Sequence, residues 1–257
     1  MADQPTRLES LIHLSRWLGE PARDCVMLGE GNTSTRLGDE SFLVKASGVE
    51  LARVEAAGFL EVGFAAALSL LSEELDDKAV KRGLNEAKVD PDSPLRPSVE
   101  TALHAVCLSL PGVEFVGHSH PTAVNAITCS KDFEAIAQQC LFPDQIVVCG
   151  AYPLLVPYVD PGVPLARELQ GRLAQHVEQH GRPPKSIYLQ NHGFIALGAS
   201  VKQVQAITLM AVKAARIAAG AIACGGIHPM SEADVRRIDG RDDEHYRQRV
   251  IESSSTA

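Results

Sequence analysis

Three histidines are the strongest candidates for metal chemistry in this sequence. His118 and His120 are separated by a single residue in the run Gly-His-Ser-His-Pro that starts at residue 117. Alternate residues of a β-strand face the same side, so the two imidazoles would project together and could share one metal ion. His192 lies in an Asn-His-Gly turn between two strand-like segments and is the candidate third ligand. Three histidines with one open position commonly hold a catalytic zinc or similar divalent ion. By itself, the His-x-His pair fits two histidines in a polar turn equally well.

The remaining histidines and the cysteines offer no second metal site. Six histidines fall on expected helices or in the tail, and we assign them no metal role: His13, His104, His176, His180, His228 and His245. The six cysteines include no pair two or three residues apart, which disfavours a Cys-rich zinc site. We expect all six to be buried free thiols rather than a disulfide framework.

A carboxylate is the next requirement, and Glu100 supplies one at the start of an expected helix, in the run Arg-Pro-Ser-Val-Glu from residue 96. The sequence alone favours a capping role, with Ser98 as N-cap and an early acid that complements the helix dipole. A helix N-terminus is also an anion site, where Ser98 could donate a hydrogen bond to a phosphate or carboxylate. The two interpretations are compatible, and both stay open.

Two short loops could bind an oxyanion on a small substrate. They are Gly-Asn-Thr-Ser at 31–34 and Lys-Ala-Ser-Gly at 45–48. Their glycines allow close backbone approach, and their polar side chains supply donors: Asn32, Ser34, Lys45 and Ser47. Each loop alone fits an ordinary turn better than a site. Neither matches the spaced phosphate-binding or dinucleotide-binding fingerprints, which argues against nucleotide binding.

Hydrophobic periodicity and turn residues place these motifs on a mixed set of elements. Helical structure is predicted at 8–18, within 54–75, and at 99–110, 163–180 and 201–224, with Pro121 opening a further helix. Strands are predicted at 41–45, after a turn at 38–39, and at 113–120, 145–149, 186–189 and 194–198. Residues 76–97 read as a surface loop. Consecutive strands among helices indicate one α/β domain with an at least partly antiparallel sheet.

Composition is that of an ordinary soluble globular protein. The 257 residues are 45% hydrophobic and 22% charged, with a formal net charge of -8. The acidic balance, without a basic stripe, argues against a nucleic-acid partner. No apolar run suggests a membrane span, and the first residues lack a secretory pattern, so we expect a cytoplasmic protein. Residues 231–257 form a charged tail, and its last few residues are expected to be disordered.

Taken in chain order, the five motifs resemble the class II aldolase/adducin family: Gly31-Asn32-Thr33-Ser34, Lys45-Ala46-Ser47-Gly48, Pro97-Ser98-Val99-Glu100, His118-Ser119-His120-Pro121 and Asn191-His192-Gly193. The resemblance covers roughly residues 8–224. The first two motifs are similar to the aldolase portion of bifunctional rhamnulose-phosphate aldolase/dehydrogenase proteins. Each motif is short, but their joint order and spacing are specific.

The resemblance implies a three-layer α/β/α fold around a largely antiparallel sheet, in a domain of residues 1–230. It also implies a homotetramer with sites between subunits. By resemblance, His118, His120 and His192 are the metal ligands, and Glu100 is the catalytic acid/base. The resemblance assigns phosphate binding to Gly31, Asn32, Ser47, Gly48 and Ser98, to which we add Lys45. A second acid/base would be a tyrosine from a neighbouring subunit, and Tyr246 is the one late candidate.

The implied activity is metal-dependent cleavage of a carbon–carbon bond in a small hydroxylated ketone, such as a ketose phosphate. A divalent cation would stabilise the enediolate that this cleavage leaves. Zinc is the default ion, although such a site also accepts manganese, cobalt, nickel or iron. We expect a desolvated pocket to raise the pKa of Glu100 so that it can exchange a proton.

One departure weakens the phosphate expectation. Val99 occupies the second serine position of the Pro-Ser-Ser-Glu pattern of fuculose-phosphate aldolases, so one hydroxyl donor is absent. Losing a donor costs about 1–3 kcal/mol where its partner is left unpaired. A decarboxylase of a hydroxy- or oxo-acid on the same metal site therefore stays open. So does a non-catalytic, adducin-like interaction module, although retention of the three histidines argues against it.

Overall fold

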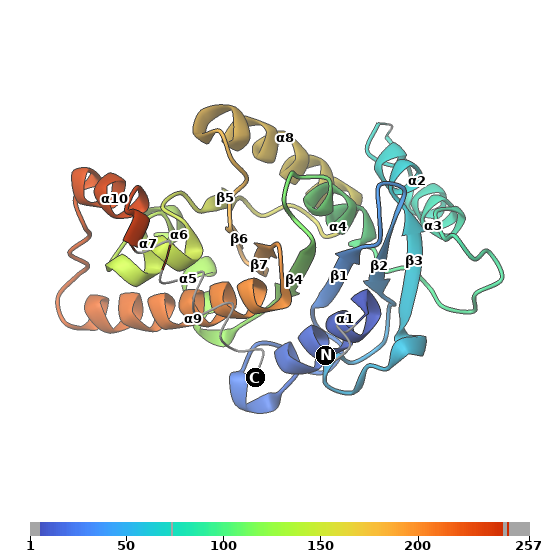
Figure 1. Cartoon of the computed structure of the whole chain (residues 1–257), viewed down its shortest axis with the longest axis horizontal. Coiled ribbons are helices and arrows are strands. Elements are labelled where there is room, and N and C mark those ends of the chain that lie inside the picture. Colours follow the sequence, from blue (N-terminus) through green and yellow to red (C-terminus); the bar gives the residue numbers. More distant parts are fainter. Residues whose placement is uncertain (1–5, 73, 244–245, 247–257) are drawn as a thin grey trace.

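The computed structural model describes residues 6–72, 74–243 and 246, and Figure 1 shows its layered arrangement. A seven-stranded sheet has the order β3-β2-β1-β4-β7-β6-β5. The strands are β1 (Asn32–Arg36), β2 (Ser41–Lys45), β3 (Phe59–Gly63), β4 (Phe115–Ser119), β5 (Leu154–Val156), β6 (Ser186–Leu189) and β7 (Gly193–Gly198). All neighbouring strands pair antiparallel except β5 and β6, which are parallel. The predicted largely antiparallel sheet is confirmed.

Helices cover both faces of this sheet. The helices are α1 (Arg7–Leu18), α2 (Phe64–Ser69), α3 (Asp77–Glu86), α4 (Thr101–Leu108), α5 (Thr122–Thr128), α6 (Phe133–Ala137), α7 (Pro143–Cys149), α8 (Val163–His180), α9 (Val201–Ala223) and α10 (Glu232–Asp239). One buried cluster joins α2, α4 and α8 to one face through residues such as Val116 and Ile195. A second joins α1, α5 and α9 to the other face through Phe115 and Phe194. Adjacent strand residues thus enter opposite cores, which is the three-layer α/β/α architecture expected.

Several predicted elements are confirmed closely. The helix expected over 163–180 is α8, and the 8–18 and 201–224 helices are α1 and α9. The strand that carries the His-x-His run is β4, and all five of its residues are buried. Pro121 is the N-cap of α5. These elements combine clear apolar periodicity with proline or glycine at their ends, so local sequence determines them.

Helix was expected within 54–75, and α2 confirms it, but the sequence did not predict the strand that precedes this helix in the same segment. Residues Phe59–Gly63 form β3, and helix follows only in α2. β3 is fixed by five antiparallel pairs with β2, from Lys45 opposite Phe59 to Ser41 opposite Gly63. Pairing with a neighbouring strand therefore overrides the helical propensity of its composition.

The segments 76–97 and 145–149 were also assigned incorrectly. The first contains α3, whose N-cap Asp76 accepts a hydrogen bond from the Ala79 amide at 2.7 Å, and whose Leu84 is buried. The second lies in α7, which opens with Pro143 in its first turn. Its β-branched residues suggested a strand, but α7 packs between α9 and α10, so almost every side is buried. Periodicity alone does not separate a buried helix from a buried strand.

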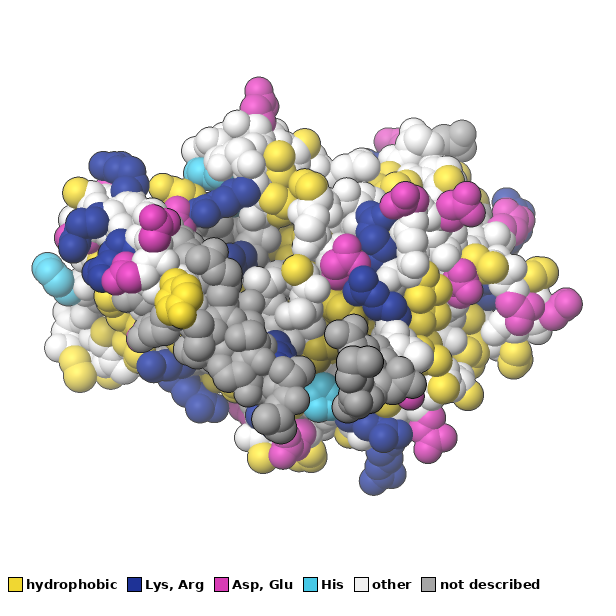
Figure 2. All heavy atoms as spheres, in the orientation of Figure 1, with side chains coloured by type: hydrophobic (Ala, Val, Ile, Leu, Met, Phe, Trp, Pro, Cys, Tyr) yellow, Lys and Arg dark blue, Asp and Glu magenta, His cyan; other side chains and the backbone are white. Residues whose placement is uncertain are grey.

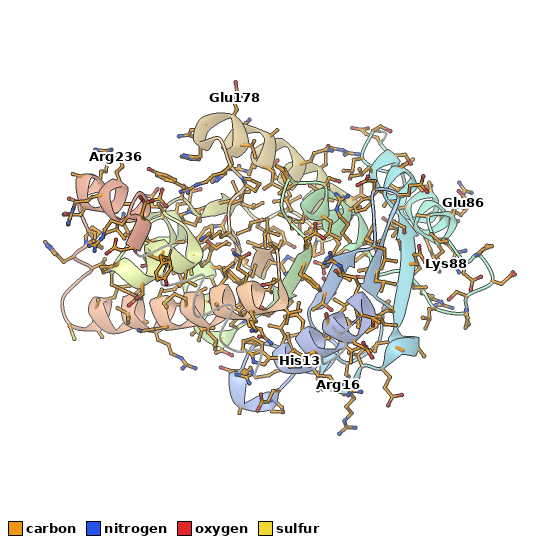
Figure 3. The ribbon with its side chains drawn as sticks, viewed as in Figure 1. His13, Arg16, Glu86, Lys88, Glu178 and Arg236 are labelled. Carbon is orange, nitrogen blue, oxygen red and sulfur yellow. The ribbon has the colours of Figure 1, made fainter. Side chains whose placement is uncertain are left out.

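The charged tail begins with structure. α10 starts after the N-cap Ser231, and its Val235 and Ile238 are buried in a small core with α7. Glu178 of α8 and Arg236 of α10 point outward from the molecule (Figure 3). The predicted disorder of the last residues concerns 247–257, which lie outside the described residues, as does His245.

All six cysteines are free, but only four are buried, so the expectation of burial was wrong for Cys129 and Cys224. Residues Val201–Ala223 are long and apolar enough to span a membrane by length and composition alone. In the structure this helix is α9, and one of its faces lies in the second core. On the described part of the face in Figure 2, acidic and basic side chains are interspersed.

Candidate metal and acid-base site

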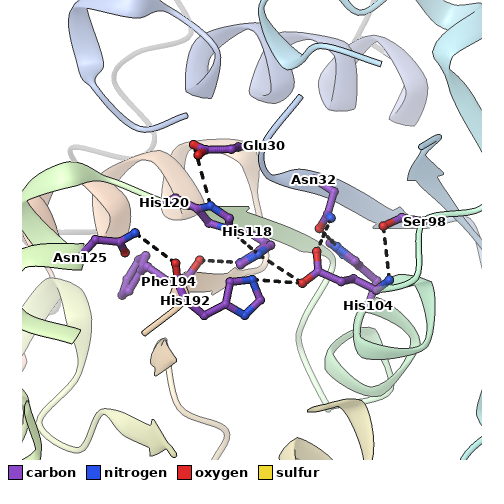
Figure 4. Close-up of polar contacts among 10 residues, drawn as sticks. Glu30, Asn32, Ser98, His104, His118, His120, Asn125, His192 and Phe194 are labelled. Carbon is purple, nitrogen blue, oxygen red and sulfur yellow. Dashed lines mark hydrogen bonds and ion pairs between the residues drawn. The ribbon is translucent and has the colours of Figure 1, made fainter. Parts of the chain in front are cut away.

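His118 and His120 meet at the end of β4, as strand alternation predicts (Figure 4). The side chain of His118 is fully buried, and its Nδ1 donates to the Phe194 carbonyl at 3.1 Å. A carbonyl only accepts, so the proton of His118 is on Nδ1 and its Nε2 is free to bind a cation. That Nε2 lies 3.1 Å from Nε2 of His120. Two ring nitrogens therefore face one point.

His192 joins them from the three-residue turn between β6 and β7. Asn191 in this turn has φ 53°, a left-handed conformation that asparagine tolerates. Asn125 Nδ2 donates to the His192 carbonyl at 3.1 Å and ties the turn to α5. The His192 ring centroid lies 4.9 Å from that of His118 and 5.1 Å from that of His120. The structure thus brings the three histidines of the sequence motifs together.

Two glycines make this convergence possible. A β-carbon at Gly193 would lie 2.6 Å from Cδ2 of His120 and 2.7 Å from the Ser119 carbonyl. At Gly31, where φ is +69°, it would lie 2.7 Å from the His118 carbonyl. All three distances are far below van der Waals contact. Glycine at these positions lets the turn and the Gly-Asn loop approach β4 closely.

Glu100 completes the cluster at the start of α4. Its Oε1 lies 3.3 Å from Nε2 of His192 and 3.6 Å from Nε2 of His118. Its Oε2 accepts a hydrogen bond from Asn32 Nδ2 at 2.7 Å. The N-cap position of α4 is Glu100 itself, and Ser98 Oγ accepts from the Glu100 amide at 3.3 Å, so the expected N-cap at Ser98 was two residues early. The carboxylate is thereby aimed at the imidazoles rather than at the helix end.

The electrostatics favour an ionised Glu100 carboxylate and neutral rings at His118 and His120. Burial opposes ionisation of Glu100, but His118, His192 and the Asn32 hydrogen bond outweigh it and hold its pKa below the usual range. The expected raised pKa was therefore wrong. Burial lowers the pKa of His118 and of His120 to about 4. At neutral pH Glu100 is therefore a carboxylate and the rings of His118 and His120 are neutral, which are the states that metal ligation requires.

The donor set fits a divalent cation. One ligand atom from each histidine lies within 4.8 Å of the others. Zinc–nitrogen bonds of about 2.0–2.1 Å in tetrahedral geometry place ligand nitrogens roughly 3.3 Å apart, close to the 3.1 Å between His118 and His120. Oε1 of Glu100 is buried with no hydrogen-bond partner among the described residues and faces the same point. Glu30 Oε2 lies 3.8 Å from Nδ1 of His120, the ring nitrogen that would not bind the metal. A carboxylate at this position commonly fixes the orientation of a metal-binding histidine ring.

The predicted oxyanion loops lie beside this cluster but differ in exposure. Ser47 and Gly48 are exposed in the turn after β2, and the Ser47 amide donates to the Arg96 carbonyl at 2.9 Å. Lys45 is buried, and its ammonium donates to the carbonyls of Val49 at 2.6 Å and Ala46 at 3.3 Å. Lys45 therefore closes the turn, and its contact with substrate stays a prediction. Burial also lowers its pKa.

A cavity of about 760 Å³ opens next to these loops. Ser47, Pro97 and Val99 line the side nearest Glu100, and Val99 is 56% exposed. Its other walls come from α3 and the start of α8, and they are largely apolar with Arg96 and Arg167 among them. In the described part of the chain, none of the three histidines lines this cavity. The loop Ser98–Glu100 thus lies between the cluster of three histidines and this cavity.

Sequence reasoning missed three polar side chains that hold the site. Glu30 precedes the Gly-Asn motif and approaches His120. Asn125 holds the His192 turn. His104 is fully buried and bonds both Asn32 and Ser34. Its spacing of four residues from Glu100 on a helix was an available signal, because such residues share a face.

Comparison with known proteins decides the family. Residues 9–219 match the family described as Class II Aldolase and Adducin N-terminal domain. The chain belongs to this family. The matched range contains every motif in which the resemblance was found, so the sequence-based recognition is confirmed.

Solved structures agree with this assignment. The N-terminal class II aldolase domain of a conserved protein from Thermoplasma acidophilum is 27% identical and covers 84% of this chain and 95% of that chain, with a TM-score of 0.65. An L-fuculose 1-phosphate aldolase from Glaciozyma antarctica PI12 is 17% identical, covers 96% and 90% of the two chains, and has a TM-score of 0.64. At that identity the second likeness shows the fold alone.

A curated relative is longer than this chain. The uncharacterized oxidoreductase YuxG of Bacillus subtilis (strain 168) is 28% identical over 206 residues, or 77% of this chain. The match covers 27% of that protein. Most of YuxG therefore has no counterpart in the present sequence.

Proposed function

We propose that this chain is a lyase: a metal-dependent aldolase that reversibly cleaves a carbon–carbon bond in a small hydroxylated ketone, with a ketose phosphate as the substrate class. The observation that carries the proposal is the convergence of His118, His120 and His192 with Oε1 of Glu100, a buried oxygen without a hydrogen-bond partner among the described residues. Membership of the class II aldolase and adducin family supports lyase chemistry.

A divalent cation held by the three imidazoles, zinc in the first instance, would polarise the ketone and offset the negative charge of an enediolate. Glu100 then exchanges the proton at the nucleophilic carbon. Its lowered pKa makes it a carboxylate at neutral pH, so it accepts the proton in the addition direction and returns it during cleavage. Asn32 holds Oε2, which leaves Oε1 as the atom that transfers the proton.

We place the oxyanion of the substrate against Gly31, Asn32, Ser47, Gly48 and Ser98, with Lys45 as the weaker member. Ser47 and Val99 line both this region and the 760 Å³ cavity, so a substrate held there extends toward Arg96. The guanidinium of Arg96 makes no ion pair with any residue that the structure describes and lies at an exposed position, where it is available to an anionic substituent.

The test is product analysis by mass spectrometry after incubating the zinc-loaded chain with a panel of ketose phosphates and hydroxy-acids. Glu100→Gln is the control, because it preserves the shape of the side chain and removes its basicity. Two carbon fragments that are absent from the control would establish the aldolase. Absence of any cleavage across the panel, in protein shown to hold metal, would refute it.

A decarboxylase of a hydroxy- or oxo-acid is the second candidate, and the exposed Val99 favours it. This side chain replaces a hydroxyl donor at the oxyanion region, which weakens the case for phosphate. Release of CO2 in place of an aldehyde distinguishes the two reactions. A non-catalytic, adducin-like module is the third candidate, and failure of the chain to bind any divalent cation would support it.

We further propose a cytoplasmic homotetramer whose sites lie between subunits, with Tyr246 of a neighbouring subunit as second acid/base. Tyr246 is 64% exposed, so its hydroxyl is free to reach another subunit. Light scattering coupled to size exclusion tests the assembly. Loss of turnover in Tyr246→Phe, with the tetramer preserved, would support the assigned role.

A further inference from the structure

A buried chain of hydrogen bonds runs inward from Glu100. Asn32 Nδ2 donates to Oε2 of Glu100 at 2.7 Å. Asn32 Oδ1 meets Nε2 of His104, and Nδ1 of His104 meets Ser34 Oγ at 2.6 Å. Each of these residues is at most 8% exposed, and His104 and Ser34 are fully buried. Figure 4 shows His104 behind Asn32, on the side away from the imidazole cluster.

The fold brings these four side chains together from two elements. Asn32 and Ser34 are alternate residues of β1 and face the same side of the sheet. Asn32 lies opposite His118 in the β1–β4 register, so this is the side on which the imidazole cluster lies. Glu100 and His104 are four residues apart at the start of α4, which packs on that side. The chain thus links the sheet face to the helix that carries Glu100.

The donor and acceptor roles along the chain follow from one constraint. The carboxylate of Glu100 only accepts, so the amide nitrogen of Asn32 must face it and the amide oxygen must face His104. An amide oxygen also only accepts, so Nε2 of His104 carries the proton. His104 is neutral because burial lowers its pKa to about 4, although Glu100 and Lys45 act on it in opposite directions. Its Nδ1 is then bare and accepts from the Ser34 hydroxyl.

We propose that His104 is a positioning residue: its Nε2–H fixes the orientation of the Asn32 amide, so that Asn32 always presents a donor to Glu100. Without this proton the amide is free to turn over and place its oxygen against the carboxylate. Glu100 would then lose both its hydrogen bond and its fixed direction toward the reacting carbon. The inference rests on the proposed function, because it assigns His104 a task for the Glu100 proton transfer.

The first test needs no turnover. In the zinc-loaded chain labelled with 15N-histidine, long-range 1H–15N correlations at neutral pH report which ring nitrogen of His104 is protonated, with the His104→Gln spectrum identifying its signals. The Nε2–H form is expected. A neutral Nδ1–H form would overturn the inference, because Nε2 could then no longer donate a hydrogen bond to Oδ1 of Asn32.

The second test uses a matched pair of substitutions. In His104→Gln the side-chain nitrogen reaches the position of Nε2 and still donates to Asn32. In His104→Asn the shorter amide ends near Nδ1, so the contact with Ser34 is kept and the donor to Asn32 is lost. We expect kcat to fall about 10–100-fold in His104→Asn, as for other outer partners of a site, with KM unchanged. His104→Gln should retain kcat within about threefold.

A double-mutant cycle separates positioning from packing. In an Asn32→Ala background, His104→Asn should have little further effect on kcat, because the group that His104 positions is gone. An undiminished loss in that background, or equal losses in the Gln and Asn variants, would overturn the inference. A wild-type chain that cleaves no substrate would instead refute the proposed function. The tautomer measurement would then still test the hydrogen-bond arrangement of His104, because it does not depend on turnover.

Discussion

Gly193→Ala is the most direct way to perturb the cluster of His118, His120 and His192 without replacing any of these three residues. The new β-carbon would lie 2.6 Å from Cδ2 of His120 and 2.7 Å from the Ser119 carbonyl. Carbon atoms in contact lie about 3.5–4.0 Å apart, so one partner must move by roughly 1 Å. Ser119 is held in β4 by its pairing with Phe194. The ring of His120 therefore gives way first, and it carries a ligand nitrogen.

The size of the effect follows from this clash. Inserting a methyl group into a well-packed site costs about 1–3 kcal/mol. If the His120 ring absorbs the displacement, this energy is lost from metal binding, which raises the Kd for zinc about 5- to 150-fold. If the backbone absorbs it, the same energy is lost from the free energy of unfolding. The two losses together should amount to about 1–3 kcal/mol.

The assay is competition with a chromophoric zinc chelator, paired with urea unfolding of the metal-free chain. Gly220→Ala is the matched control, because Gly220 lies inside α9 and its β-carbon would meet nothing within 4 Å. That variant should bind zinc like wild type and gain up to about 1 kcal/mol of stability from helix propensity. A Gly193→Ala chain with wild-type zinc affinity and wild-type unfolding would refute the close approach on which the site depends.

Three further outcomes are expected. Removing the metal with a chelator should abolish turnover. It should also lower the free energy of unfolding by about 4 kcal/mol, compared with the same chain in free zinc at about 1,000 times the Kd. Calorimetry measures this difference, and an unchanged unfolding profile would contradict the metal site. Val99→Ser should lower KM for a ketose phosphate about fivefold, from about 1 kcal/mol of added hydrogen bonding, in steady-state kinetics, whereas no change for any phosphate would favour the decarboxylase. Because the pKa of His104 is about 4 when folded and 6.5 in the free side chain, the unfolded chain binds more protons between these values. Stability is therefore lost as pH falls through this window, by up to about 3 kcal/mol from this group, and His104→Gln should show a shallower loss in urea titrations at pH 6.5 and 4.5.

The sequence predicts the site better than it predicts the fold around it. His118 and His120 are two residues apart on one strand, so period-two alternation alone brings their imidazoles together. His192 needs only a tight turn, and the Asn-His-Gly run indicates one. By contrast, β3 and α7 depend on partners distant in sequence: β2 for the strand, and α9 and α10 for the helix. Composition within each segment favours the wrong state, so no local pattern corrects it.

Electrostatics explain the error on Glu100. Burial does oppose its ionisation, as the sequence-based argument assumed, but that argument left out what the carboxylate faces. The two imidazoles and the Asn32 amide come from three separate elements, β4, the β6–β7 turn and β1, and together they lower the pKa by more than burial raises it. The sign of a pKa shift at such a site depends on tertiary contacts, which a single segment does not specify.

The hydrogen-bond chain behind Glu100 shows which information was missing. Both halves are visible locally, because Asn32 and Ser34 share a strand face and Glu100 and His104 share a helix face. What joins them is the register that sets Asn32 opposite His118, together with the packing of α4 on that same face. Once that packing is known, a neutral His104 ring can form both of its hydrogen bonds in only one way: Nε2–H donates to Asn32, and Nδ1 accepts from the Ser34 hydroxyl. The role of His104 therefore could not be predicted from its own segment, because it depends on tertiary contacts. Measuring which ring nitrogen of His104 carries the proton now tests how Glu100 is held.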